Sequence, residues 1–397
     1  MDADHGCKLN PEIAMVSIDD FLVRIRLSAK VAELNLQLGH DGEFLPQPAE
    51  MGRSIYTLIK RIWHLVPLGD RGVSCRELSE ATGINERPLI TIIRYAIVHR
   101  IFDENAEGRV VHSRVSRWIK EDPLVEQYVG SCCLDTMLAP RLIGRALEQW
   151  PDADDPSYTA FMLANSMLAG RPVEEKSTFY KILAENPEKA RRFAACMNFL
   201  RSEDVYSVDH AISGYDWGAL PHGSTVVDLG GSYGDVSIAL AKHFSKLSFI
   251  VQDLLETIDA ALELPGELSD RIHFAVHNFL DHQPVRGAQV YLLRWVLHNW
   301  SDADAVKIHQ ALMPALSDGC TILIQDAKMP RLGSLPNAVE RETRWLDMMM
   351  LALLNAGDRE EAQWRSLIAK ADSRSKWQGV TAMEGSALNF IEMVWEP

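Results

Sequence analysis

The chain has 397 residues, of which 47% are hydrophobic and 24% are charged. This is the composition of a folded globular protein with room for two domains, so it excludes a disordered or low-complexity chain. The formal net charge of -15 repels phosphate backbones, and no locally concentrated basic face stands out in the sequence. We therefore expect no nucleic-acid partner.

The cysteines and the first residues limit the compartment and the metal chemistry. The six cysteines are scattered, with no pair at the spacing of a zinc site: Cys7, Cys75, Cys132, Cys133, Cys196 and Cys320. Residues 1–30 carry charged side chains throughout, so they contain neither a secretory core nor a membrane-spanning run. We expect a cytoplasmic protein with reduced thiols, no bound metal and no membrane partner.

Residues 73–120 contain strong signals for two helices and a hairpin. Ser74 followed by Glu77 is a capping-box pattern, and the helix it opens ends near Gly83. Asn85 can cap a second helix, which has apolar residues at every third or fourth position. Two short strands, 101–104 and 109–112, follow around a loop that contains Gly108. The pattern predicts a winged helix within a mainly helical domain over residues 1–122.

A winged helix often binds DNA, and DNA binding requires a basic surface. The basic side chains are Arg87, Arg94 and Arg100, and acidic side chains interrupt them: Glu86, Asp103, Glu104 and Glu107. We prefer a scaffold for dimerisation. A DNA-binding regulator stays open as an alternative.

The segment 122–222 reads as a helical connector, with helix-breaking prolines between amphipathic stretches. Two of its methionines, Met162 and Met197, could line a pocket for a flat aromatic molecule, because thioethers pack adaptably on rings. Such residues are also common in cores. We group this connector with the rest of the chain as a second domain, 123–397.

The segment 225–234 has the pattern of a nucleotide-binding turn. A β-branched strand at 225–229 leads into Gly230, Gly231 and Gly234, and a helical stretch follows at 235–244. Glycines suit such a turn because a ligand must approach the backbone closely. The next strand, 247–251, is followed by Asp253, whose carboxylate can accept hydrogen bonds from ribose hydroxyls. Up to this point NAD and S-adenosylmethionine fit equally well.

Three more strands are predicted at 273–277, 288–293 and 321–324, and a final hairpin at 378–381 and 386–395 completes a mixed α/β sheet. Ligands of such sheets sit over the carboxyl ends of the strands. The residues expected to ring one crevice there are Gly230, Asp253, Asn278, Arg294, His298 and Asp326.

Three segments carry a family resemblance: VDLGGSYG at 227–234, VQDLL at 251–255 and LRWVLHNWSD at 293–302. With these motifs the chain resembles the caffeic acid-type S-adenosylmethionine-dependent O-methyltransferases, and most closely their fungal polyketide and secondary-metabolite relatives. The resemblance covers nearly the whole chain, and its His-x-Trp-x-Asp element is more specific than the glycines. It implies a Rossmann-like, mixed seven-stranded methyltransferase sheet and a homodimer formed through the N-terminal winged helix.

The resemblance also implies roles for single residues. His298 would be the general base, flanked by Asp326 and Asp358. The residues expected to hold S-adenosylmethionine are Gly230, Gly231, Asp253, Leu254, Asn278, Phe279 and Arg294. The candidate contacts of the acceptor are Met162, Met197, Trp295, Met349 and Asn355.

The sequence departs from the family pattern at three positions. Asp358 is one methylene shorter than the expected Glu, Ser232 replaces a glycine of the plant members, and Asn278 stands where an Asp is frequent. The serine is a normal variant among the fungal relatives. The shorter Asp358 leaves the orientation of His298 open.

The chemistry of these residue types agrees with methyl transfer. A sulfonium methyl group moves by in-line displacement, so the protein must align the reacting atoms and remove a proton. A phenol, whose pKa is near 10, needs a base at neutral pH, and a neutral imidazole can accept the proton. A carboxylate bonded to the other ring nitrogen would fix the tautomer and stabilise the imidazolium. No metal is required.

Simpler roles remain for each of these residues. His298 could be a packing histidine, Asp253 a helix cap, Asp326 a strand terminator and Asn355 a helix cap. One rival function keeps S-adenosylmethionine but not the transfer, as in related dehydratase-like or pericyclase-like enzymes of secondary metabolism. The other rival is the DNA-binding regulator.

Overall fold

A computed structural model describes residues 55–174, 177–202, 204–259 and 264–397. The chain divides into two compact units: unit 1 comprises 1–141 with 163–200, and unit 2 comprises 142–162 with 201–397. Unit 1 thus extends beyond the 122 residues assigned to a first domain from the sequence, and the helical connector is shared between the units. Cys7 and the charged segment 1–30 lie outside the described residues.

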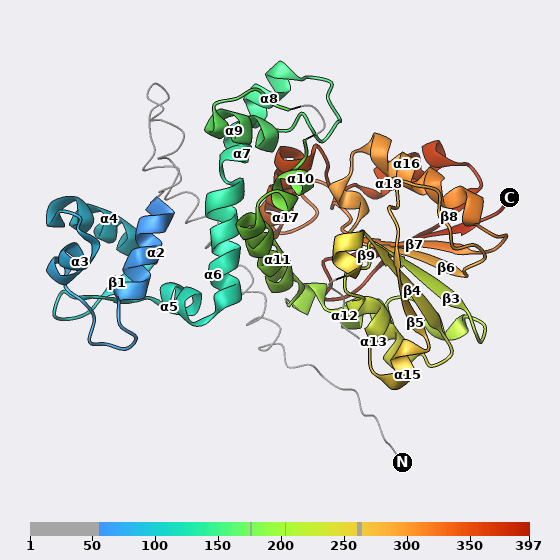
Figure 1. Ribbon diagram of the computed structural model, residues 1–397, viewed down its shortest axis with the longest axis horizontal. Helices are drawn as coiled ribbons and strands as arrows, with labels where there is room; N and C mark the ends of the chain where they lie inside the picture. The colour runs from blue at the N-terminus through green and yellow to red at the C-terminus, as the bar shows by residue number, and fades with distance from the viewer. Residues whose placement is uncertain (1–54, 175–176, 203, 260–263) are drawn as a thin grey trace, which may run out of the picture. The chain divides into compact units, whose positions relative to one another are not determined.

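Unit 1 is helical except for one hairpin (Figure 1). Its elements, of which α9 and α11 reach into unit 2, are α2 (Ile55–Leu65), α3 (Cys75–Thr82), α4 (Glu86–Val98), β1 (Phe102–Glu104), β2 (Val110–His112), α5 (Arg114–Glu121), α6 (Pro123–Gly130), the π-helical turn η1 (Ser131–Thr136), α7 (Leu138–Arg141), α9 (Ala160–Ala169), α10 (Phe179–Ala184) and α11 (Pro187–Arg201).

The elements predicted between residues 73 and 120 are present in unit 1. Ser74 accepts a hydrogen bond from the N–H of Glu77 and donates its own N–H to the Glu77 carboxylate, so α3 begins with the expected capping box. The helix ends at Gly83, which has the left-handed φ of 71° that glycine adopts readily. Asn85 occupies the cap position of α4, although its side chain makes no capping bond. β1 and β2 pair antiparallel.

Unit 2 contains the sheet. Its elements are α8 (Ile143–Gln149), the 3-10 turn η2 (Asp204–Tyr206), α12 (Val208–Ser213), η3 (Trp217–Ala219), β3 (Thr225–Leu229), α13 (Asp235–His243), β4 (Ser248–Asp253), α14 (Leu255–Ile258), α15 (Gly266–Ser269), β5 (Ile272–Val276), β6 (Val290–Arg294), η4 (Leu297–Asn299), α16 (Asp302–Leu312), η5 (Met313–Ala315), β7 (Thr321–Asp326), α17 (Asn337–Leu354), α18 (Glu361–Ala371), β8 (Ser375–Ala382) and β9 (Asn389–Trp395).

The sheet has seven strands in the order β5-β4-β3-β6-β7-β9-β8. The first five in that order are parallel, whereas β9 runs antiparallel to both β7 and β8. This is the Rossmann-like, mixed seven-stranded methyltransferase sheet that the sequence predicts, so the predicted fold class is confirmed. The strand order reverses beside β3, which is the place where such sheets bind ligands.

Alternate residues of each central strand enter different cores. Val227, Tyr291 and Ile322 pack with α16 and α18 on one face, whereas Val226 and Leu292 pack with α12 and α13 on the other. Side chains of a strand point alternately to the two faces of the sheet. A strand whose two faces are both covered by helices therefore needs successive apolar residues. Figure 1 shows α16 and α18 together beside the strands. This packing holds the carboxyl ends of the strands in fixed positions.

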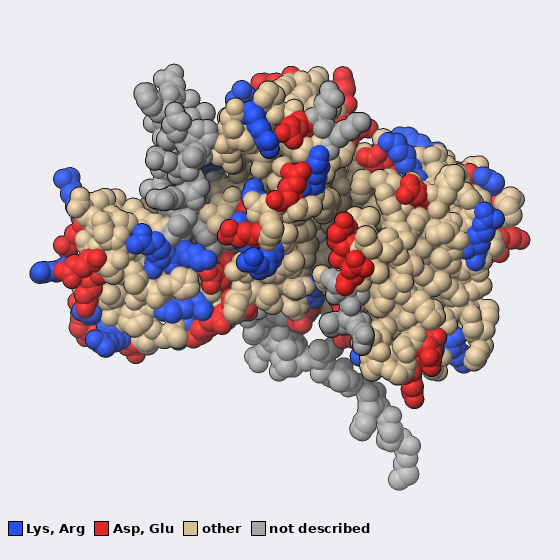
Figure 2. All heavy atoms as spheres, in the orientation of Figure 1, with Lys and Arg blue, Asp and Glu red and all other residues tan. Residues whose placement is uncertain are grey.

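Several bulk expectations can be compared with the described residues. None of their helices combines the length and the apolar character needed to cross a membrane. Their cysteines are free thiols: Cys75, Cys132, Cys133, Cys196 and Cys320. On the face drawn in Figure 2, basic and acidic side chains are interspersed over both units. The face shown therefore has no broad surface of one sign.

Candidate active site

The five parallel strands bring most of the predicted site residues to one edge of the sheet. In register, Leu229 pairs with Gln252 and Asp253 pairs with Val276. Arg294, at the end of β6, pairs with Gln325, one residue before Asp326. The turn after β3, the ends of β4, β6 and β7, and the loop after β5 therefore surround the same region. The shared edge follows from the parallel order of these strands.

The turn between β3 and α13 needs its glycines for two different reasons. Gly230 has a φ of 69°, which side chains disfavour, and a Cβ there would lie 3.1 Å from Val296. Gly231 has no room, because a Cβ would lie 2.7 Å from the carboxyl carbon of Asp228. The backbone of the turn is thus left bare at the carboxyl end of β3. This is the geometry that lets a nucleoside approach main-chain atoms.

Asp253 ends β4 beside this turn. One carboxylate oxygen accepts the N–H of Ser232 at 2.9 Å, and the other accepts the N–H of Leu254 at 2.8 Å. These bonds fix the carboxylate, and each oxygen keeps further lone pairs for hydroxyl donors. The simpler interpretation, a cap for the next helix, fits less well, because Leu254 stands at the cap position of α14 and makes no side-chain capping bond. Leu254 itself is 53% exposed.

Asn278 and Phe279 follow β5. Asn278 is exposed, and its side-chain oxygen accepts the N–H of Leu280. The ring of Phe279 meets Trp300 edge to face at a centroid distance of 5.6 Å, and lies 3.5 Å from the position of a Cβ on Gly230. Phe279 therefore joins the glycine turn to the loop that contains His298. The predicted contact of Asn278 and Phe279 with adenine stays a prediction.

Arg294 is held by protein groups. Its Nε donates to the side-chain oxygen of Gln325 at 3.0 Å, and one Nη donates to the carbonyl of Tyr206 at 2.7 Å. Burial lowers the pKa of the guanidinium, while the nearby Asp228 carboxylate raises it. The structure therefore gives Arg294 a bracing contact with η2, and its predicted contact with the cofactor stays a prediction.

His298 lies in η4 between the two predicted carboxylates. Its backbone N–H donates to Asp326 at 3.0 Å, and its ring Nδ1 lies 3.7 Å from a carboxylate oxygen of Asp358. Both Asp326 and Asp358 are buried side chains, and this oxygen of Asp358 has no hydrogen-bond partner. A shift of the His298 ring by less than an ångström would therefore bring its Nδ1–H within hydrogen-bond distance of this Asp358 oxygen. Catalytic hydrogen bonds are often longer than usual before a substrate binds.

Burial and neighbouring charges have opposite effects on the pKa values of His298 and Asp326. Burial lowers the pKa of His298, but the carboxylates of Asp326 and Asp358 raise it by more, so the pKa ends above its ordinary value. Burial also raises the pKa of Asp326, which the cationic ring and Arg359 partly offset. An imidazolium formed at His298 is thus stabilised by the charges of two buried carboxylates. That is the state a general base reaches after taking a proton.

Trp295 forms a wall beside His298. The two rings are parallel within 6° at a centroid distance of 6.1 Å, and Tyr206 lies against Trp295 at 4.5 Å. Trp295 has a left-handed φ of 58°, which is unusual for an aromatic residue and costs of the order of 1–3 kcal/mol. Such strain is found mainly where a side chain must be aimed at a site. The predicted contact of Trp295 with the acceptor stays a prediction.

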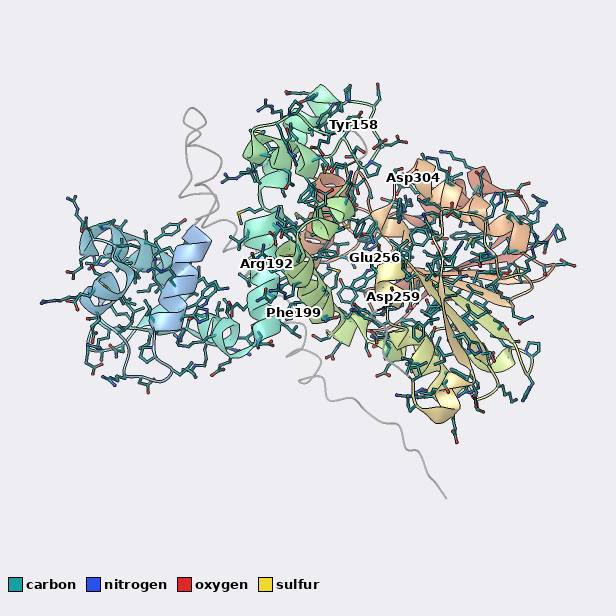
Figure 3. The ribbon with its side chains drawn as sticks, viewed as in Figure 1. Tyr158, Arg192, Phe199, Glu256, Asp259 and Asp304 are labelled. Carbon is teal, nitrogen blue, oxygen red and sulfur yellow. The ribbon has the colours of Figure 1, made fainter. Side chains whose placement is uncertain are left out.

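The other predicted acceptor contacts lie in different settings. Met162 is buried in α9, and Met349 is half-buried in α17. Asn355 ends α17 with a left-handed φ of 52°, and its amide donates to the carbonyls of Ala153, Asp155 and Tyr158. Asn355 therefore binds the loop before α9, where Figure 3 labels Tyr158. Met197 packs against the core of unit 1.

Four further residues, outside the predicted set, shape this site. Arg359 donates to the carbonyls of Leu297 and Trp300 and to the carboxylate of Asp302. Asp347 accepts the N–H of Asp358 at 2.9 Å. Tyr206 supports Trp295, and the buried Asp228 underlies the glycine turn with a pKa raised by burial to about 6. Asp228 carried a signal in the sequence as a charged residue in an apolar strand, and Arg359 carried one as the Arg that follows Asp358 in the family pattern.

One set of side chains among the described residues could be considered for a metal. His298, Asp326 and Asp358 each offer a ligand atom, and these atoms lie within 4.8 Å of one another. One oxygen of Asp326 is already bonded to a backbone N–H. The geometry suits a proton relay better than a metal centre.

Comparison with known proteins connects this geometry to a family. Residues 169–373 match the family described as the O-methyltransferase domain. The chain is 36% identical over 340 residues to the O-methyltransferase pgmB of Aspergillus terreus, covering 84% of this chain and 92% of that protein. It is 34% identical over 336 residues to a chlorophenol O-methyltransferase of Trichoderma longibrachiatum, covering 84% and 70%.

Solved structures share the fold at lower identity. The enzyme OxaC, in complex with sinefungin and meleagrin, aligns with a TM-score of 0.67 at 22% identity, covering 94% of this chain and 99% of that one. LepI in complex with S-adenosylmethionine aligns with a TM-score of 0.65 at 21% identity, covering 98% and 100%. At these identities the likeness is one of fold.

Proposed function

This chain belongs to the O-methyltransferase family, and from that premise we propose that it transfers a methyl group to a phenolic hydroxyl of a secondary metabolite such as a polyketide, with His298 as the general base. The observation that carries the proposal is the setting of His298, whose ring faces the buried, unpartnered oxygen of Asp358.

The cofactor of the chain is S-adenosylmethionine. The residues present fit it, because the turn carries no side chain at Gly230 and Gly231, and Asp253 offers fixed acceptor oxygens beside that turn. Leu254, Asn278 and Phe279 would flank the adenine. When bound, the cofactor supplies an electrophilic methyl group.

The chain's own residues would bind, orient and deprotonate the acceptor. Trp295, braced by Tyr206, would hold a flat ring, and the free ring nitrogen of His298 would take the hydroxyl proton. The Asp358 carboxylate would hold the proton at Nδ1 and stabilise the imidazolium. Such base catalysis contributes about a hundred- to ten-thousandfold to the rate.

The acceptor class rests on two supports. The Trp295 ring, which is parallel to the ring of the base and packs against Tyr206, suits an aromatic acceptor. Two relatives at 34% and 37% identity are a chlorophenol O-methyltransferase and an O-methyltransferase of the grayanic acid biosynthesis cluster of Cladonia grayi. The first name supports a phenolic acceptor, and the second supports a role in a biosynthetic cluster.

Calorimetric binding and methyl transfer test the proposal together. The binding of S-adenosylmethionine and S-adenosylhomocysteine is measured for the wild type, for His298→Ala and for the control His222→Ala. His222 is exposed and precedes β3, at the edge of the sheet opposite to the site. Transfer to a panel of phenols is then measured for all three proteins.

We expect equal cofactor binding in the three proteins, with transfer lost only in His298→Ala. Cofactor binding without transfer to any phenol by the wild type would favour the non-methylating, pericyclase-like alternative. Absence of cofactor binding would contradict both.

For unit 1 we propose a winged-helix scaffold, within the predicted domain 1–122, that supports a cytoplasmic homodimer without a nucleic-acid or membrane partner. The helices α3 and α4, followed by the β1–β2 hairpin, support the winged helix. Light scattering should give twice the chain mass. A specific gel shift with DNA at physiological salt would favour the regulator instead.

A further inference from the structure

Arg359 directly follows Asp358 and is fixed to the segment after β7. Its carbonyl accepts the N–H of Met329 at 3.0 Å, and its backbone forms a parallel bridge with Lys328. Asp326 lies two residues before Lys328. The backbone of Arg359 is therefore tied to the same short segment that carries one of the two carboxylates of the site.

The side chain of Arg359 reaches the other part of the site. Its Nη1 donates to the carbonyl of Leu297 at 2.9 Å, and its Nη2 donates to the carbonyl of Trp300 at 2.7 Å. These carbonyls stand on either side of His298 in the chain. The guanidinium is buried, and it lies over the ring of Trp364 at 5.1 Å. A planar fork fixed at both carbonyls holds the loop in one orientation.

Asp302 completes this arrangement. Its carboxylate accepts from the Nε of Arg359 at 2.8 Å, although the Asp302 side chain is 65% exposed. Asp302 does not cap α16, because Ser301 does so by accepting the N–H of Asp304. Asp304, labelled in Figure 3, pairs instead with Lys307 at 2.7 Å. The final residue of the His-x-Trp-x-Asp element is thus the partner of Arg359.

We propose that Arg359 is a positioning residue for the methyl transfer, holding the loop 297–300 so that the ring of His298 faces Asp358, and that Asp302 keeps the guanidinium in this orientation. The inference rests on the proposed role of His298 as the base. It assigns a function to two residues that do not touch the reacting atoms.

The charge of Arg359 gives the inference a signature that simple packing lacks. The groups facing His298 are Asp326 from β7, and Asp358 and Arg359 from the loop after α17. Tyr206 and Asp347 lie near Asp358. The two carboxylates raise the pKa of His298, and Arg359 opposes them. Removing the guanidinium should therefore raise the pKa of His298 further.

Four variants separate position from charge. Arg359→Gln removes both the fork and the charge, and Arg359→Lys keeps the charge without the fork. Asp302→Asn loses the ion pair but leaves the guanidinium charged. Arg365→Gln is the control, because it removes an exposed arginine of α18 that lies over Trp377.

The readouts are kcat and KM on an accepted phenol across pH, the Kd of S-adenosylmethionine, and the titration of the His298 ring by NMR, assigned by comparison with His298→Gln. We expect kcat to fall about tenfold or more in Arg359→Gln and Arg359→Lys, and less in Asp302→Asn, with Kd unchanged within twofold. Only Arg359→Gln should move the His298 titration, and the acidic limb of kcat/KM, to higher pH.

Several outcomes would overturn the inference. The first is a kcat in both Arg359→Lys and Asp302→Asn that equals the kcat of the control Arg365→Gln. The second is a His298 titration in Arg359→Gln that equals the titration in the wild type. If Arg359→Gln does not fold, the kcat of Asp302→Asn still tests the inference, because the Asp302 side chain is at the surface and its substitution should leave the fold intact. If the wild type methylates no phenol, the proposed function fails, while the NMR titration still tests Arg359 by itself.

Discussion

Asp326 binds the backbone of His298 and not its ring: the carboxylate accepts the His298 N–H at 3.0 Å, while the ring Nδ1 faces Asp358 at 3.7 Å. The two carboxylates expected to flank the base therefore have different roles. Asp326 fixes where η4 begins and contributes its charge. Asp358 alone is placed to hold the proton on the ring.

The length of the Asp358 side chain should limit the rate. At 3.7 Å the contact is longer than a hydrogen bond, and one more methylene would close the gap. Asp358→Glu should keep or raise kcat. Asp358→Asn, which removes the charge, should lower kcat about ten- to a hundredfold, because a hydrogen bond to a charged group is lost. Initial rates at saturating S-adenosylmethionine measure both, and a slower Asp358→Glu than Asp358→Asn would contradict this geometry.

The same carboxylates set the pH dependence. The base acts when neutral, so kcat/KM should rise with pH through the pKa of His298, which the carboxylates place above the ordinary 6.5. Asp358→Asn removes one of the charges that raise the pKa of His298. The acidic limb of its kcat/KM profile should therefore move to lower pH. The rate profile between pH 5 and 9 measures it. A limb that stays in place would mean that another group titrates.

Much of the sheet could be predicted from the sequence, because its signals are local. The strand 225–229 was predicted with the bounds that β3 has, and the glycine turn and Asp253 follow it as expected. The parallel order then places the strand ends at one edge without further information. This is why Gly230, Asp253, Arg294 and Asp326 could be predicted to lie together.

The contacts that orient the base could not be predicted in this way. Arg359 and Asp302 are 57 residues apart, and the amide of Asn355 binds carbonyls about 200 residues away. Such pairs depend on how α16, α17 and the loops pack, and nothing in the local pattern specifies them. The left-handed Trp295 is also invisible in the sequence, since tryptophan rarely adopts that conformation.

The glycine turn should tolerate no side chain at Gly231. A Cβ would lie 2.7 Å from Asp228 and 2.8 Å from Val251, both in buried strands, so Gly231→Ala should lower the free energy of unfolding by about 1–3 kcal/mol and weaken cofactor binding. Thermal unfolding and calorimetry measure the two effects. Gly144→Ala is the control: a Cβ at Gly144, within α8, would meet no atom within 4 Å. Equal Tm values for the two variants would contradict the clash.

A buried histidine away from the site should make the fold sensitive to acid. His309, in α16, is bonded through Nε2 to the hydroxyl of Ser375 at 2.7 Å, and burial lowers its pKa to about 4. In the unfolded chain the same ring titrates near 6.5, so the unfolded state binds the proton first as the pH falls. Stability is therefore complete above pH 6.5 and decreases between pH 6.5 and 4, by about 3 kcal/mol for this group.

His309→Gln should remove that part of the pH dependence, because its amide can still bond Ser375 but does not titrate. Urea unfolding at pH 7 and pH 4.5 gives the difference for each protein. The loss on acidification should be smaller in His309→Gln than in the wild type, and His273→Gln, an exposed histidine of β5, should behave like the wild type. An equal loss in all three would mean that groups other than His309 dominate the acid response.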